Sequence, residues 1–239
     1  MRFNTLLLAG ALSLAAAGCS RAQDANFDAK VRAYLLAHPE VIEEAVQKLQ
    51  EKRDLEDAVK TKTALQSRRQ ALEHDPRDFV ANPDGKITVT QFFDYRCPHC
   101  INAAPTVLKM IKANPDVRFV FKEMPIFGAT SEHAARVAIA ARQSGGYLKF
   151  YEAAMSTKGL NDQVVDQIAK SEGIDPSRTD AGDGRKAADA QLQDVHKLAL
   201  ELNVGGTPTF IVGDTVVPGE DMEAVQTAID KARASSRKS

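Results

Sequence analysis

The apolar and polar positions along the chain change their spacing near residue 77. Before this point the apolar residues recur every three or four positions, which is typical of exposed helices. After it, β-branched and aromatic runs alternate with longer stretches of helical pattern, which predicts strands between helices. We therefore expect a helical segment over residues 23–76 and an α/β domain over residues 77–239.

The helical segment is expected to contain two helices, because Pro39 suits the first position of a helix, where no N–H is needed. Residues 50–75 have no continuous apolar stripe and predict a polar connector that lets the domains move. A narrow apolar face cannot be buried by its own helix, so it packs either on its own domain or on other copies of the chain. One such face holds Ile42, Ala45, Val46 and Leu49, and another, before Pro39, holds Val31 and Leu35.

The α/β domain opens with strand–helix–strand and closes with a hairpin and a helix. This order predicts a sheet that helices cover on both faces. The predicted elements are strands at residues 86–95 and 116–127, a helix at 97–113, about four helices within 131–202, a hairpin at 207–219 and a last helix at 220–234.

The first 22 residues have the layout of a secretory signal peptide. Arg2 precedes an apolar stretch over residues 6–17, which is too short to span a bilayer. Cys19 follows Ala-Ala-Gly, which resembles a lipoprotein cleavage box, although Ala16 stands where that pattern prefers leucine. Ordinary cleavage after Ala22 is the alternative, and both interpretations predict export to an oxidising compartment.

Composition excludes several classes of protein. The formal net charge is −1 and 26% of the residues are charged, which argues against a basic nucleic-acid-binding protein and against a disordered chain. With three cysteines, the chain is not a small domain held together by disulfides, so its stability must come from an ordinary hydrophobic core.

Cys97 and Cys100 stand at the junction between a predicted strand and a predicted helix. A structural disulfide between them would close almost no loop and add little stability. A zinc site needs four ligands, which the rest of the domain does not supply, whereas a copper site of two soft thiolates stays open. A redox pair suits the layout best: the helix N-terminus stabilises an exposed, attacking Cys97 thiolate, and Cys100 follows one turn later as the resolving sulfur.

The Cys-Pro-His-Cys sequence at 97–100 and the Gly-Gly-Thr-Pro-Thr-Phe sequence at 205–210 together resemble the DsbA-like branch of the thioredoxin family. The resemblance covers residues 78–234 and implies a thioredoxin fold with a DsbA-like helical insertion at about 129–203. It also implies that Pro208 is cis, follows Thr207 and lies against the cysteines, where it binds client proteins. The helical extension is similar to that of trimeric ScsC (suppressor of copper sensitivity) proteins, which implies an oligomerisation stalk.

Three more residues are candidates for the site. Pro98 and His99 complete the motif, and a partly cationic imidazole favours the thiolate and makes the pair more oxidising. The alternative for His99 is a turn residue selected for its shape. Glu123 has two interpretations: a buried carboxylate that relays protons near Cys100, or a surface ion pair with Lys122.

The sequence thus predicts a periplasmic thiol–disulfide oxidoreductase that needs no cofactor and no metal. An oligomeric disulfide isomerase is favoured, because a tethered second site meets its client at a high effective concentration. The alternatives are a monomeric DsbA-type oxidase and a copper-binding or holdase protein that uses the thiols as ligands. Expected partners are misoxidised or reduced secreted clients, other copies of the chain in a homotrimer and, by resemblance, a membrane-bound thiol reductase of the ScsB or DsbD kind. No nucleic acid is expected.

Overall fold

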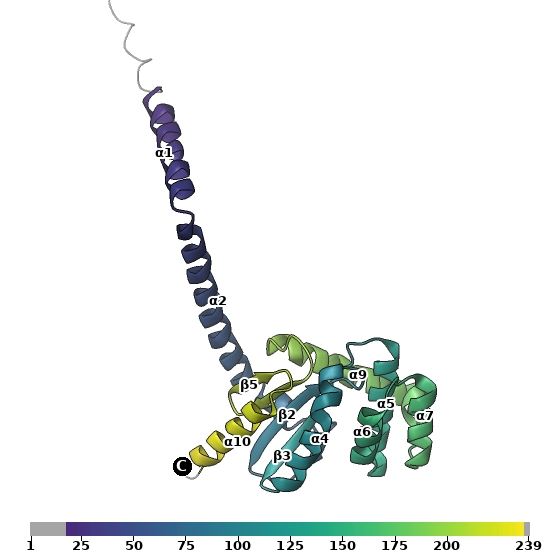
Figure 1. The fold of residues 1–239 in the computed structure, drawn as a ribbon. Helices are drawn as coiled ribbons and strands as arrows, with labels where there is room; N and C mark the ends of the chain where they lie inside the picture. Colours follow the sequence, from purple (N-terminus) through teal and green to yellow (C-terminus); the bar gives the residue numbers. More distant parts are fainter. Residues whose placement is uncertain (1–17, 237–239) are drawn as a thin grey trace, which may run out of the picture. The chain divides into compact units, whose positions relative to one another are not determined.

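The computed structural model describes residues 18–236, so the predicted signal peptide falls largely outside the described residues, as does the side chain of Cys19. The chain divides into two compact units, Met1–Ala58 and Val59–Ser239 (Figure 1). Among the described residues, every helix is too short or too polar to cross a lipid bilayer.

The first unit is helical. Helix α1 spans Gly18–Ala37 and helix α2 spans Glu40–Ser67, with the break before Pro39 as the sequence predicts. The side chains of the two predicted faces are largely exposed, with Val31 at 40%, Ile42 at 51% and Val46 at 61%. These apolar residues are therefore available to a partner, as a narrow helical face requires.

The second unit begins earlier than the sequence indicated. The last turns of α2 and the short helix α3 (Arg69–Glu73) belong to it, because Leu65 and Leu72 are fully buried. Both leucines pack in one hydrophobic cluster with Phe92 and Leu198. Residues 59–76 therefore belong to the second unit and contribute Leu65 and Leu72 to its core, and the expected polar connector is reduced to residues 50–58.

The core of the second unit is a mixed five-stranded sheet with the order β1-β3-β2-β4-β5. Strands β2 and β3 are parallel, with Phe93 beside Glu123, and the other neighbouring pairs are antiparallel. β1 is not among the strands that the sequence predicts; it is only three residues long and pairs with β3. The strands are β1 (Phe79–Ala81), β2 (Ile87–Phe93), β3 (Val117–Glu123), β4 (Thr209–Val212) and β5 (Thr215–Pro218).

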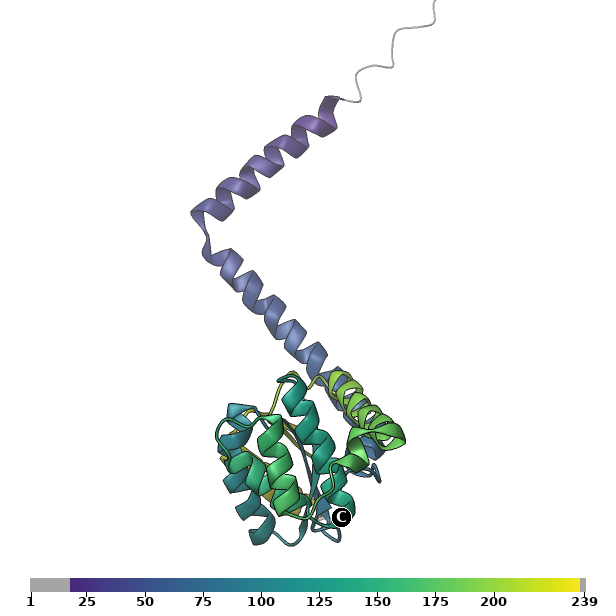
Figure 2. The same cartoon turned by 90° about the vertical axis from the view of Figure 1, so that its right-hand side faces the viewer.

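Helices cover both faces of the sheet, as the sequence predicts. Helices α4, α6 and α10 pack on one face through a cluster that includes Val89, Phe93 and Cys100. The opposite face is covered by α3 and α9 through the cluster of Leu72 and Phe92. In the insertion, α5, α6 and α7 lie against one another (Figure 2). The helices of this unit are α4 (Pro98–Ala113), α5 (Ala129–Ser144), α6 (Tyr147–Ser156), α7 (Asp162–Ser171), α8 (Ser177–Asp180), α9 (Gly182–Glu201) and α10 (Met222–Ser236).

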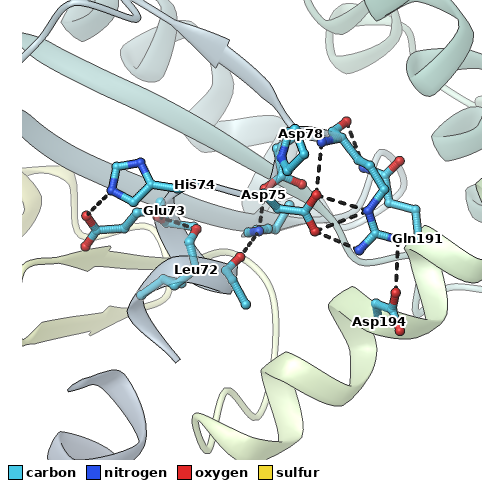
Figure 3. Close-up of polar contacts among 12 residues, drawn as sticks. Leu72, Glu73, His74, Asp75, Asp78, Gln191 and Asp194 are labelled. Carbon is cyan, nitrogen blue, oxygen red and sulfur yellow. Dashed lines mark hydrogen bonds and ion pairs between the residues drawn. The ribbon is translucent and has the colours of Figure 1, made fainter. Parts of the chain in front are cut away.

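A buried polar network holds residues 71–78 on the sheet (Figure 3). The Lys122 ammonium donates to the Ala71 carbonyl at 2.6 Å and forms an ion pair with Asp78, and both charged side chains are 1% exposed. Burial raises the pKa of Asp78 to about 6, although Lys122 acts in the opposite direction. Gln191 of α9 donates to the Arg77 carbonyl at 3.0 Å. Because a buried charge is costly without its partner, this network fixes the entry of the chain into the domain.

Candidate active site

The end of β2 is fixed by a buried carboxylate, Asp94, which is 1% exposed. It accepts hydrogen bonds from the backbone N–H of Ile126 at 2.7 Å and of Phe127 at 3.0 Å, and from the Ser131 hydroxyl at 2.8 Å. Asp94 therefore joins the loop after β3 to the loop that leads into the cysteines. It also leaves Ile126 and Phe127 exposed on the surface, at 43% and 44%.

Cys97 is the N-cap of α4, and Pro98 occupies the first turn. The Cys97 carbonyl accepts the N–H of Ile101 at 3.0 Å, so the helix begins at the cysteine. Cys97 therefore lies at the positively polarised end of α4. Pro105 lies inside a helix that continues to Ala113.

The Cys97 thiol donates to the carbonyl of Thr207, with 3.1 Å between the sulfur and the oxygen. The Thr207–Pro208 peptide bond is cis. The sequence predicts an exposed Cys97, but the residue is only 2% exposed, because the loop at Thr207 lies against its sulfur. Cys97 and Thr207 are thus brought together, although they are far apart in the sequence.

Cys100 is fully buried one turn into α4. Burial raises the pKa of the Cys100 thiol far above its usual range, and the neighbouring Cys97 acts in the same direction. Both cysteines are free thiols in this structure. The arrangement provides one sulfur at a helix N-terminus and a second sulfur that keeps its proton until a base removes it.

The His99 side chain lies on the exposed side of the motif, whereas both cysteines are buried. Its ring is 65% exposed, and Nδ1 donates to the carboxylate of Glu220 at 3.1 Å. Glu220 lies in the turn between β5 and α10. Glu220 is not among the predicted site residues, because nothing in the local pattern relates the turn at residue 220 to the motif at residue 99.

Glu123 is buried rather than on the surface, so the interpretation as a surface ion pair with Lys122 is wrong. Lys122 pairs with Asp78 on the other face of the sheet, because neighbouring strand residues point to opposite faces. The Glu123 carboxylate accepts hydrogen bonds from the Tyr147 hydroxyl at 2.5 Å and the Tyr95 hydroxyl at 3.3 Å. Burial raises the pKa of Glu123 well above its usual range, against the effect of these two hydrogen bonds.

A third tyrosine, Tyr151, is close enough to both Cys100 and Glu123 for each to affect its pKa. Tyr151 is fully buried, and its raised pKa comes mainly from burial, with further contributions from Cys100 and Glu123. Gln91 donates to the Tyr151 hydroxyl at 3.4 Å, and its own Oε1 is buried with no hydrogen-bond partner among the described residues. Gln91 and the tyrosines are not among the site residues that the sequence predicts. The spacing of Tyr147 and Tyr151, one helical turn apart, was the available signal.

Within residues 18–236 as the structure describes them, no three His, Cys, Asp or Glu side chains gather in a way that would hold a metal ion. The polar groups around the two thiols are instead a carbonyl, a histidine with its carboxylate, and a buried cluster of tyrosines with Glu123. This set is suited to proton and thiolate chemistry.

Comparison with known proteins agrees with this geometry. Residues 88–230 match the family model described as a DSBA-like thioredoxin domain, and residues 23–54 match the copper resistance protein ScsC N-terminal domain. The thiol:disulfide interchange protein DsbA of Bordetella pertussis is 28% identical over 188 residues, which cover 74% of this chain and 88% of that protein. The Na⁺/H⁺ antiporter NhaA 3 of Salinispora tropica is 30% identical over 174 residues, but the chain spans only 26% of its length.

Two solved structures are similar over most of their length. A thioredoxin-like oxidoreductase from Silicibacter pomeroyi is 40% identical, with a TM-score of 0.64, and the match covers 70% of this chain and 98% of that one. ScsC of Proteus mirabilis in a transitional conformation is 27% identical, with a TM-score of 0.66, and the match covers 90% of this chain and 99% of that one. The second match extends into the helical N-terminal segment.

Proposed function

The chain belongs to the DSBA-like thioredoxin domain family, a family of thiol–disulfide oxidoreductases, and from this premise we propose that it is an exported, oligomeric protein disulfide isomerase. The observation that carries the chemistry is the Cys97 sulfur at the N-terminus of α4, 3.1 Å from the Thr207 carbonyl, with Cys100 buried behind it. The signal-like N-terminus supports export to the periplasm.

The Cys97 thiolate attacks one sulfur of a client disulfide, forms a mixed disulfide and releases the other client sulfur as a thiolate. A client thiolate then attacks the mixed disulfide, and Cys97 leaves as a thiolate with no net oxidation. When the client stays bound too long, the Cys100 thiolate attacks the Cys97 sulfur. The client is then released with two thiols, and the Cys97–Cys100 pair becomes a disulfide.

Clients are proposed to bind along the loop of Thr207 and Pro208. An extended peptide that adds to a strand edge there would place its own sulfur beside Cys97 and compete for the position that the Thr207 carbonyl now holds. Ile126 and Phe127 offer exposed apolar side chains on the loop that Asp94 fastens to the motif. Unfolded clients expose apolar residues, so this loop suits them.

Glu123 is proposed to accept the proton of Cys100 when the mixed disulfide is resolved. The thiol is buried and has a raised pKa, so it needs a base. Burial also raises the pKa of Glu123, so its ionised form is a stronger base than an ordinary carboxylate. The hydroxyls of Tyr147 and Tyr95, which donate to Glu123, and that of Tyr151 are proposed to take part in the transfer.

The helical N-terminal segment is proposed to join three copies of the chain. Its match to the ScsC N-terminal domain and the exposed faces of Val31 and Ile42 support this. Each aliphatic side chain contributes about 1.5–3 kcal/mol when it is buried, so a few per chain suffice. An isomerase must be kept reduced, and a membrane-bound thiol reductase of the ScsB or DsbD kind is the proposed partner.

Deletion of residues 23–58 tests the proposal, because the remaining residues form a compact unit. The full chain is expected to sediment as an oligomer and to repair scrambled ribonuclease. The chain without residues 23–58 is expected to be a monomer that still oxidises reduced ribonuclease. Cys97→Ser in the full chain is the inactive control. Equal repair by both forms would contradict the role of the oligomer, and oxidation of reduced ribonuclease without any repair of scrambled ribonuclease would assign an oxidase. Stoichiometric copper uptake without turnover would assign a copper-binding protein.

A further inference from the structure

The residue between the two cysteines has a specific partner outside the motif. The Nδ1 atom of His99 donates to the Glu220 carboxylate at 3.1 Å, and the two side chains are 65% and 38% exposed. We propose that Glu220 is a positioning residue that lowers the oxidising power of the Cys97–Cys100 pair by acting through His99. This inference rests on the proposed redox function of the pair.

The backbone around Glu220 is held at both ends. Gly219, with a φ of 79°, donates its N–H to the Pro208 carbonyl at 2.8 Å. Such a φ favours glycine. On the other side, the Asp221 carboxylate accepts the N–H of Ala224 at 2.9 Å and so caps α10. Glu220 is therefore placed by the loop that contacts Cys97 and by a capped helix, which gives its contact with His99 a structural cause.

The direction of the effect follows from charge. A cationic imidazole between the cysteines stabilises the Cys97 thiolate, and hence the reduced form, which makes the disulfide a stronger oxidant. A ring N–H that donates to Glu220 is not available to the sulfur. The Cys97 thiolate therefore loses stabilisation by the imidazole, and the reduced form is less favoured.

The measurement is the equilibrium in which the protein dithiol and oxidised glutathione give the protein disulfide and two molecules of reduced glutathione. The full chain and its Glu220→Gln variant are compared at pH 7 and low salt. Because exposed ion pairs are weak, we expect the equilibrium constant to fall about threefold in the variant, which corresponds to a potential higher by ~14 mV at about 30 mV per tenfold. Glu223→Gln removes an equal charge from the exposed first turn of α10 and serves as the matched control.

A second pair of variants separates positioning from a general effect on the loop. Glu220→Gln introduced into His99→Ala should change the equilibrium constant little, because the carboxylate then has no imidazole to hold. The shift in the single variant should also shrink at about 1 M salt, where screening is strong. An unchanged or higher constant in Glu220→Gln, or an equal shift without His99, would overturn the inference. A parent protein that does not equilibrate with glutathione would instead overturn the proposed function.

Discussion

Leu72 is expected to stabilise the catalytic domain, although it lies in a helical segment that the sequence presents as polar. Its side chain is fully buried, and it packs with Leu65, Phe92 and Leu198 on the face of the sheet opposite to the cysteines. Truncation of a buried leucine to alanine removes its transfer free energy and leaves a cavity. Leu72→Ala should therefore lower the free energy of unfolding by about 2–5 kcal/mol.

The matched control is Leu55→Ala, since Leu55 is 69% exposed on the same helical segment. Its effect should stay within about 0.5 kcal/mol, because exposed substitutions rarely do more. Urea unfolding of the reduced full-length proteins, followed by circular dichroism, gives both values. With a slope of about 2 kcal/mol per molar urea, Leu72→Ala moves the midpoint down by roughly 1–2.5 M.

Two truncated chains extend this test. A chain that starts at residue 59 keeps Leu65, Leu72 and the Ala71 carbonyl that accepts the Lys122 ammonium, whereas a chain that starts at residue 77 loses all three. The second should be less stable by at least the loss measured for Leu72→Ala, because it also leaves a buried ammonium without one acceptor. Equal stability of the two truncated chains, or equal effects of Leu72→Ala and Leu55→Ala, would refute the reasoning.

Two further predictions concern the redox face of the sheet. Cys97→Ser should abolish thiol–disulfide exchange, while Cys100→Ser should accumulate mixed disulfides with clients on non-reducing gels; full exchange by Cys97→Ser would rule out the redox role. Glu123 holds its proton in the folded state at pH values where the unfolded chain has released it, because burial raises its pKa. Its contribution to stability is therefore complete below about pH 4.5 and is lost as the pH rises toward the folded pKa, by up to about 1.4 kcal/mol per pH unit. Glu123→Gln should remove this slope in urea unfolding at pH 5, 6 and 7, and parallel profiles of the two proteins would contradict it.

The parts of the fold that the sequence predicted correctly are those with a strong local pattern. The apolar run of β2, the proline and cysteines that open α4 and the Gly-Asp turn of the last hairpin each carry their own signal. β1 lacks such a signal, because three residues have no period and the strand exists through its pairing with β3. The sequence places Leu65 and Leu72 in a polar helix, because the residues that bury them are distant in the sequence.

The candidate site shows the same division. Two short, recognisable sequences contain the predicted site residues Cys97, Cys100, Thr207 and Pro208. The structure brings Cys97 and Thr207 together. The burial of Glu123 depends on tyrosines from two other elements, and the exposure of Cys97 depends on a loop that is over 100 positions away. Long-range contacts of this kind leave no periodic trace in a single sequence.

The β4–β5 hairpin region contacts two residues of the redox motif, Cys97 and His99. The loop before β4 supplies the Thr207 carbonyl that meets the Cys97 sulfur, and the turn after β5 supplies the Glu220 carboxylate that meets His99. The two are joined directly, because the N–H of Gly219 donates to the Pro208 carbonyl at 2.8 Å. A client that binds along the Thr207 loop therefore acts on a backbone that also carries the carboxylate. Client binding should for this reason be coupled to the equilibrium between the dithiol and disulfide forms. A client peptide should change the glutathione equilibrium less in Glu220→Gln than in the parent protein.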